Sequence, residues 1–90
     1  MTVDVTANHP AVVDGLDVNE VKDGLVVYDP KTDRVHYLNA TASIVFSVCD
    51  GAHDRADIAR IVGTAFSLDE PPVDDVDECL ATFEREGLLQ

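Results

Sequence analysis

The stretch that decides the fold is Leu38-Asn39-Ala40-Thr41-Ala42, because strand-like sequence ends there and helical periodicity begins. Before it, residues 17–38 contain three short strand-like runs separated by two turn signals. After it, apolar residues recur at helical spacing in three segments that reach the C-terminus. This order predicts an α+β fold, in which a three-stranded antiparallel sheet is followed by three helices packed as a winged-helix-like domain.

Two turn signals divide the strand region. Asp23-Gly24 lies between two runs of strand formers and predicts a two-residue hairpin in which both turn residues have positive φ. The second turn, residues 29–33, contains Pro30, which presets φ for a turn and cannot extend a strand. The third strand is therefore expected at residues 34–38.

End signals delimit the helices. Asn39 or Thr41 is expected to cap the first helix, which is apolar on most sides and should be central, with Gly51 as its C-terminal stop. The second helix is expected to begin at Asp54, where acidic residues favour the helix dipole. Pro71-Pro72 suits the first turn of the third helix.

Length and composition predict one small domain. The chain has 90 residues and is 46% hydrophobic, too apolar for a disordered protein. We expect residues 1–15 to be a flexible N-terminal arm and residues 16–90 to form the domain, with a homodimer as one way to add stability. No apolar run is long enough to span a membrane, and residues 1–11 do not resemble a signal peptide, so we expect a cytoplasmic protein without membrane contact.

Charge and side-chain chemistry argue against most catalytic or nucleic-acid-binding functions. The net charge is −12, from 18 acidic and 6 basic residues, and such a surface repels phosphate backbones. The three histidines do not have metal-site spacing, and no Gly-rich phosphate loop or nucleophile motif is present. Cys49 and Cys79 are too few for a zinc or iron–sulfur site and are expected to be buried free thiols. The sequence therefore predicts a protein that is not an enzyme and has no metal or cofactor.

Two other small-domain classes fit less well. An acyl carrier protein needs an Asp-Ser-Leu motif opening a helix, whereas Ser67-Leu68 lies at a helix end. A winged-helix DNA-binding regulator fits the predicted elements and is the alternative function. Its recognition helix should present Arg and Lys to the groove, but the third helix carries six acidic residues and one arginine.

An ordered set of short motifs resembles the PqqD-like family. The resemblance covers residues 16–89 and is carried by the following segments: Gly24-Leu25-Val26-Val27-Tyr28-Asp29, Tyr37-Leu38-Asn39-Ala40-Thr41-Ala42, Asp50-Gly51, Asp57-Ile58, Asp75-Val76, Leu80, Phe83 and Gly87-Leu88-Leu89. It implies a non-catalytic recognition element for ribosomally made, post-translationally modified peptides. Such a domain holds the leader of a precursor peptide and presents the rest to a modifying enzyme, often a radical S-adenosylmethionine enzyme.

The resemblance also implies where the leader would bind. In the family the leader adds as a strand beside the third strand and packs against the third helix. Carried over, this points to the edge residues Arg34, Val35, His36 and Tyr37, and to the helix residues Val76, Cys79, Leu80 and Phe83.

The residues themselves support a peptide-binding edge. An unpaired strand edge exposes N–H and C=O groups to which another strand can bind, unless the protein covers it or pairs it in a dimer. Strand alternation should place His36 and Leu38 on the core face, with Val35 and Tyr37 opposite. On the third helix, Val76, Cys79 and Phe83 lie one turn apart along a single apolar line. Asp75 and Glu78 lie next to that line, so we hypothesise that they attract a Lys or Arg of the leader.

Overall fold

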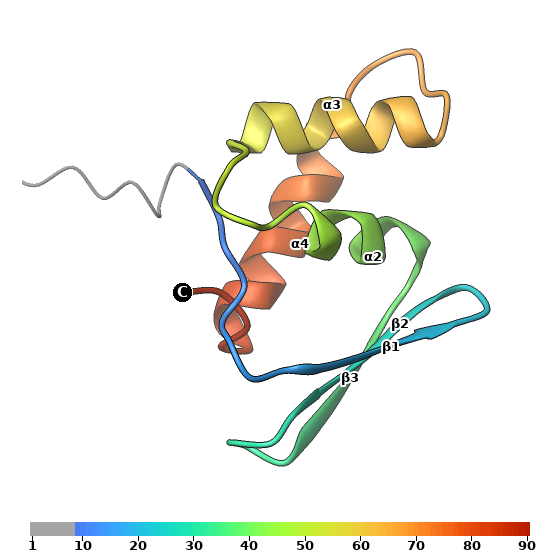
Figure 1. The fold of residues 1–90 in the computed structure, drawn as a ribbon. Helices are drawn as coiled ribbons and strands as arrows, with labels where there is room; N and C mark the ends of the chain where they lie inside the picture. Colours follow the sequence, from blue (N-terminus) through green and yellow to red (C-terminus); the bar gives the residue numbers. More distant parts are fainter. Residues whose placement is uncertain (1–8) are drawn as a thin grey trace, which may run out of the picture.

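Three strands precede three helices in the computed structural model, which describes residues 9–90. The elements are β1 (Asp17–Val21), β2 (Gly24–Asp29), β3 (Arg34–Leu38), α2 (Ala40–Ser47), α3 (Arg55–Ala65) and α4 (Val73–Arg85). Figure 1 shows the helices together on one side of the sheet. The predicted α+β order of three antiparallel strands and then three helices is confirmed. None of the helices in the described part of the chain is long and apolar enough to cross a membrane.

The sheet has one face toward the helices and one face open. Both strand pairs are antiparallel, in the order β1-β2-β3. Leu25 and Val27 of β2 are buried on the helix side, and their partners on β3 are Leu38 and His36. Val35 and Tyr37 therefore lie on the open face, as strand alternation predicts.

The first hairpin turns one residue earlier than the sequence suggests. Val21 pairs with Gly24, so the two turn residues are Lys22 and Asp23. Asp23 and Gly24 do not have the predicted positive φ. Gly24 is needed for another reason: a Cβ on this residue would lie 1.8 Å from the carbonyl oxygen of Leu38. The glycine permits a close approach of two strands rather than a left-handed turn.

Side-chain hydrogen bonds fix the second turn, between β2 and β3. The buried Asp29 carboxylate accepts from the backbone N–H of Lys31 at 3.0 Å, and Asp33 adopts a φ of 57°. The hydroxyl of Tyr28 donates to Asp33 at 2.7 Å. This hydrogen bond and nearby negative charge raise the pKa of Tyr28. The turn therefore holds the start of β3 in a defined place.

α2 begins directly after β3 because Asn39 caps it. The Asn39 side chain accepts from the backbone N–H of Ala42 at 2.8 Å, which makes Asn39 the N-cap rather than Thr41. Val45 and Phe46 are buried, and α2 contacts both the sheet and the other helices, as expected for a central helix. The predicted stop at Gly51 is wrong: α2 ends at Ser47, and Gly51 has its positive φ in the loop beyond.

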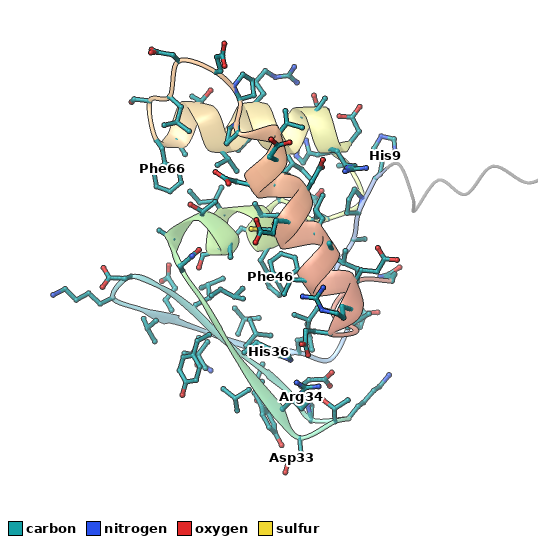
Figure 2. All side chains as sticks on the ribbon, turned by 180° about the vertical axis from the view of Figure 1, so that it is seen from behind. His9, Asp33, Arg34, His36, Phe46 and Phe66 are labelled. Atoms are coloured by element: carbon teal, nitrogen blue, oxygen red, sulfur yellow. The ribbon has the colours of Figure 1, made fainter. Side chains whose placement is uncertain are left out.

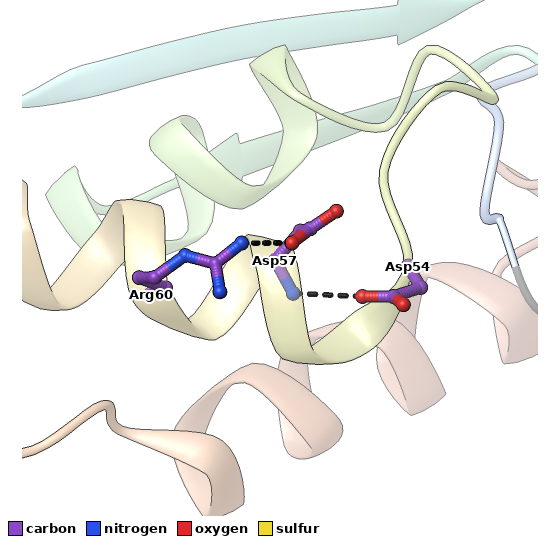
Figure 3. Close-up of polar contacts among 3 residues, drawn as sticks. All are labelled: Asp54, Asp57 and Arg60. Carbon is purple, nitrogen blue, oxygen red and sulfur yellow. Dashed lines mark hydrogen bonds and ion pairs between the residues drawn. The ribbon is translucent and has the colours of Figure 1, made fainter.

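The cap predicted for α3 is present. Figure 3 shows the Asp54 carboxylate accepting from the backbone N–H of Asp57, at 2.8 Å, and Asp57 in turn paired with Arg60. Asp54 therefore satisfies a free backbone N–H group, and the negative charges of Asp54 and Asp57 favour the helix dipole at the first turn. They are engaged within α3 itself.

One apolar stripe of α4 completes the core. Val76, Leu80 and Phe83 are buried, and the Phe83 ring packs edge-to-face against Phe46 with ring centroids 5.9 Å apart. After α4, Gly87 has a φ of 74° and the buried Leu88 donates to the Phe83 carbonyl at 2.8 Å. This helix end closes the base of the core.

Part of the predicted loose arm is in fact tied into the fold. The N–H of Val12 donates to Cys49 and the N–H of Val13 donates to Leu88, both at 2.9 Å. Gln90 donates its N–H to Ala11 at 2.8 Å. Residues 10–13 of the predicted arm therefore bond to segments far away in the sequence, and the boundary at residue 15 stays a prediction. Residues 1–8 lie outside the described part of the chain.

Candidate functional site

The outer edge of β3 is free of any strand partner in the described part of the chain, because β3 is last in the sheet. The Leu38 carbonyl points toward β2, where it approaches Gly24. In an antiparallel ladder the backbone groups of alternate residues point the same way, so those of His36 and Arg34 also face β2. Val35 and Tyr37 then direct their N–H and C=O groups outward. These four groups match the hydrogen bonds that an added strand would make.

A groove of about 450 Å³ lies between this edge and α4. One wall is formed by the end of β3 and the start of α2, and the other by one face of α4. The lining residues are Tyr37, Leu38, Asn39, Thr41, Ala42, Asp75, Glu78, Cys79, Thr82 and Phe83. The groove thus combines backbone groups at an edge with a mixed apolar and acidic helix face.

Tyr37 stands at the mouth of the groove. Its side chain is 81% exposed, the most exposed large apolar side chain of the described residues. Val35, two residues earlier on the same face of the sheet, is 49% exposed. These side chains provide apolar surface on the open side of the sheet, next to the outward backbone groups.

The acidic residues of α4 differ in their partners. Asp77 accepts from the guanidinium of Arg55 on α3 at 2.9 Å. Glu86, just past the helix end, lies 3.0 Å from the Arg34 guanidinium of β3, as an ion pair without the alignment of a hydrogen bond. Within residues 9–90, Asp75 and Glu78 make no ion pair, and both line the groove. Negative charge is therefore left unpaired on the groove wall.

The Arg34–Glu86 ion pair marks one end of the edge. Figure 2 shows Arg34 and His36 on the side of the sheet that faces the helices. The Arg34 side chain is 60% exposed and that of Glu86 only 24%. Because β3 begins at Arg34 and α4 ends next to Glu86, the two elements run in opposite directions along the groove.

Neither cysteine is an activated nucleophile. Burial raises the pKa of Cys49 to about 12. Burial, and then the charges of Asp75 and Glu78, raise the pKa of Cys79. A raised pKa keeps a thiol protonated at neutral pH, whereas reactive cysteines have depressed values. Among residues 9–90, no three His, Cys, Asp or Glu side chains come together where they could hold a metal ion.

The opposite edge of the sheet also borders a hollow. A space of about 580 Å³ lies beside β1, and Val18, Glu20, Phe46 and Gln90 are among its lining residues. Residues of the 11–14 segment and the end of α2, at Phe46 and Ser47, are among those around it. β1 is the second candidate edge, and an experiment on binding must distinguish it from β3.

Comparison with known proteins places the chain in a family. The model of a family described as coenzyme PQQ synthesis protein D (PqqD) matches residues 24–89. The chain belongs to the PqqD family. No curated protein matches it. Among solved structures, TbiB1 in complex with the TbiA(beta) leader peptide is similar, with a TM-score of 0.75 and 21% identity, over 89% of this chain and 94% of that chain. At this identity the likeness establishes the fold.

This PqqD family member brings about half of the sequence-predicted site residues together at the groove. Those that line it are Tyr37, Asp75, Glu78, Cys79 and Phe83. Arg34 and Val35 belong to the same strand but lie beyond the lining, and His36 is half-buried on the helix side with a buried, unpartnered Nε2. Val76 and Leu80 are 0% and 7% exposed, pack in the core and are not among the residues that line the groove.

The sequence analysis did not predict several of the residues that line the groove of this PqqD family member. They are Leu38, Asn39, Thr41, Ala42 and Thr82. The first four lie at the junction between β3 and α2, where the first turn of α2 forms the end of the groove wall. Thr82 lies one helical turn after Glu78, so spacing on the helix could have found it.

Proposed function

We propose that this domain binds the leader of a ribosomally made precursor peptide and presents the remainder to a modifying enzyme. The observation that carries the proposal is the free edge of β3, with the backbone groups of Val35 and Tyr37 turned outward beside a groove walled by α4. A peptide added there in extended form would gain main-chain hydrogen bonds from the edge and side-chain contacts from the groove. Membership of the PqqD family supports this reading, and so does the leader peptide named with TbiB1.

We propose that the domain acts without catalysis of its own. The support is chemical: both thiols have raised pKa values, and the acids of α3 and α4 serve caps, ion pairs and the groove wall. The reaction would then belong to a partner, for which the family resemblance suggests a radical S-adenosylmethionine enzyme. Because a precursor is made on ribosomes, we place the encounter in the cytoplasm.

A titration followed residue by residue tests the proposal. The ¹⁵N-labelled protein is titrated with a synthetic peptide that matches the leader of a neighbouring short open reading frame, and with a scrambled peptide of the same composition. We expect amide shifts at Val35, Tyr37 and the groove face of α4 with the leader alone. Shifts that concentrate on β1, at Val18 and Glu20, would move the binding site to the other edge.

Duplex DNA is the comparator for the winged-helix alternative. Because the net charge is −12, we expect no DNA binding at physiological salt. Binding to DNA that weakens steeply with salt, together with no response to the leader, would contradict the proposed function.

A further inference from the structure

The acids of α4 sort by position into paired and unpaired groups. Asp77, which faces α3, is paired with Arg55, and Glu86, at the helix end, is paired with Arg34. Asp75 and Glu78 face the groove and have no ion-pair partner in the described part of the chain. Asp74 and Glu84 also make no ion pair within residues 9–90 but do not line the groove, so Asp75 and Glu78 are the uncompensated carboxylates of α4 that a peptide in the groove would meet.

The other end of the groove has a different character. The Arg85 guanidinium donates to the Thr82 hydroxyl at 3.3 Å, and Thr82 lines the groove. Arg34 stands at the same end, where it pairs with Glu86. At that end Arg34 and Arg85 are accompanied by Glu84 and Glu86, so the charges balance, whereas Asp75 and Glu78 at the other end make no ion pair within residues 9–90. A cationic side chain of a bound peptide has one favourable place.

The direction of an added strand determines which part of a bound peptide lies beside Asp75 and Glu78. The sheet is wholly antiparallel, so we expect a further strand to run antiparallel to β3. Because β3 and α4 run in opposite directions, such a strand runs in the direction of α4. Its first residues then lie beside Asp75 and Glu78, and its last residues lie beside Arg34 and Glu86. Alternate side chains of the strand face α4.

We infer that the leader held by this domain carries a lysine or arginine in the first half of its bound strand, facing Asp75 and Glu78. The inference rests on the proposed function and specifies its ligand. Asp75 and Glu78 are exposed, so their attraction for a cation is moderate and is weakened by salt. The preference is a property of this groove, since it comes from two lining acids that make no ion pair within residues 9–90.

The experiment uses random peptides of about ten residues, long enough to cover a strand of ordinary length. The displayed library is selected in parallel on the wild-type protein, on Asp75→Asn/Glu78→Gln, and on Asp74→Asn/Glu84→Gln. The last variant is the matched control, because it removes the same charge from exposed positions of α4 that do not line the groove. Circular dichroism confirms that all three proteins are folded.

We expect Lys or Arg to be enriched at one position in the first half of peptides selected by the wild type and the control, and not by the groove variant. For a selected peptide, replacing that residue with Gln should weaken binding to the wild type about three- to tenfold, and the difference should shrink at about 1 M NaCl. Equal basic enrichment on the groove variant would overturn the inference while leaving the proposed function intact. If no peptide is enriched on the wild type, the proposed function fails, and the inference with it.

Discussion

The carbonyl oxygen of Leu38 occupies the place where residue 24 would carry its Cβ. The distance from that carbonyl oxygen to a Cβ built on Gly24 would be 1.8 Å, far below any van der Waals contact. The Ser43 hydroxyl, which donates to the Asn39 carbonyl at 2.7 Å, also lies 3.2 Å from the Leu38 carbonyl oxygen. The end of β3, the start of β2 and the first turn of α2 are therefore packed around one backbone group.

Gly24→Ala should consequently destabilise the fold. The added methyl must push β3 away from β2, and we expect the free energy of unfolding to fall by about 2–4 kcal/mol. Gly87→Ala is the control: it adds a methyl in open space at a φ of 74°, so the loss should be about 1–2 kcal/mol. Urea unfolding followed by circular dichroism measures both. Equal stability of Gly24→Ala and wild type would contradict the close approach.

Val35→Pro tests the outward edge. Proline removes the N–H that faces away from β2, so the sheet should remain paired while an added strand loses a hydrogen bond and meets the ring. We expect leader affinity, measured by calorimetry, to fall by at least about tenfold, or 1.4 kcal/mol. His36→Pro should instead unfold the domain, because that N–H faces β2.

Val35→Thr completes this comparison. It keeps the β-branched shape and the N–H, so leader binding should match that of the wild type. A folded Val35→Pro protein with wild-type affinity would place the peptide elsewhere.

Cys79 reports occupancy of the groove by its reaction with iodoacetamide. At about pH 8 we expect slow alkylation, because the raised pKa leaves little thiolate. A bound leader should protect Cys79 further. Asp75→Asn/Glu78→Gln should speed the reaction only in part, since removing the charges lowers the pKa while burial remains. Cys49, which is 1% exposed, should stay unmodified in the same mass spectra. Alkylation of Cys79 at the same rate with and without leader would argue against a peptide in this groove.

The Arg34–Glu86 ion pair should contribute little to stability. The Arg34 side chain is 60% exposed, so solvent screens the pair, and Glu86→Gln should lower the free energy of unfolding by no more than about 1 kcal/mol. The loss should vanish at high salt. Glu84→Gln, an exposed acid of the same helix, serves as the comparison in thermal unfolding. A large loss that persists in salt would mean that the pair is shielded from water.

Much of the fold follows from local sequence signals. The junction at residues 38–42, the caps Asn39 and Asp54 and the glycine after α4 each act within a few residues, where side chain and backbone meet directly. The hairpin register could not be derived this way. Asp23-Gly24 has the composition of a turn, but Gly24 is required by the close approach of the Leu38 carbonyl, fourteen positions later in the sequence. A local sequence pattern cannot show such a contact.

Part of the groove could be predicted from the spacing of residues along α4. Spacing along a helix shows which residues share a stripe, so Asp75, Glu78 and Cys79 could be placed together. Whether a residue at the stripe lines a groove or enters the core depends on how α4 crosses the sheet. Val76 and Leu80 therefore entered the core, and the first turn of α2 supplied a wall that the sequence did not indicate. Residues 10–13 are held by a few long-range backbone hydrogen bonds. Such bonds leave no periodic pattern of apolar residues in the sequence.

The unpaired acids of α4 have a consequence for how copies of this chain meet. An open strand edge invites self-association, and two β3 edges joined about a twofold axis would be the simplest dimer. In such a pairing the two β3 strands run antiparallel, so Asp75 and Glu78 of each copy would lie beside the Arg34 end of the other copy's β3. Opposite charges would then meet at each end of the seam, so a second copy of the chain and a basic leader would compete for the same strand edge.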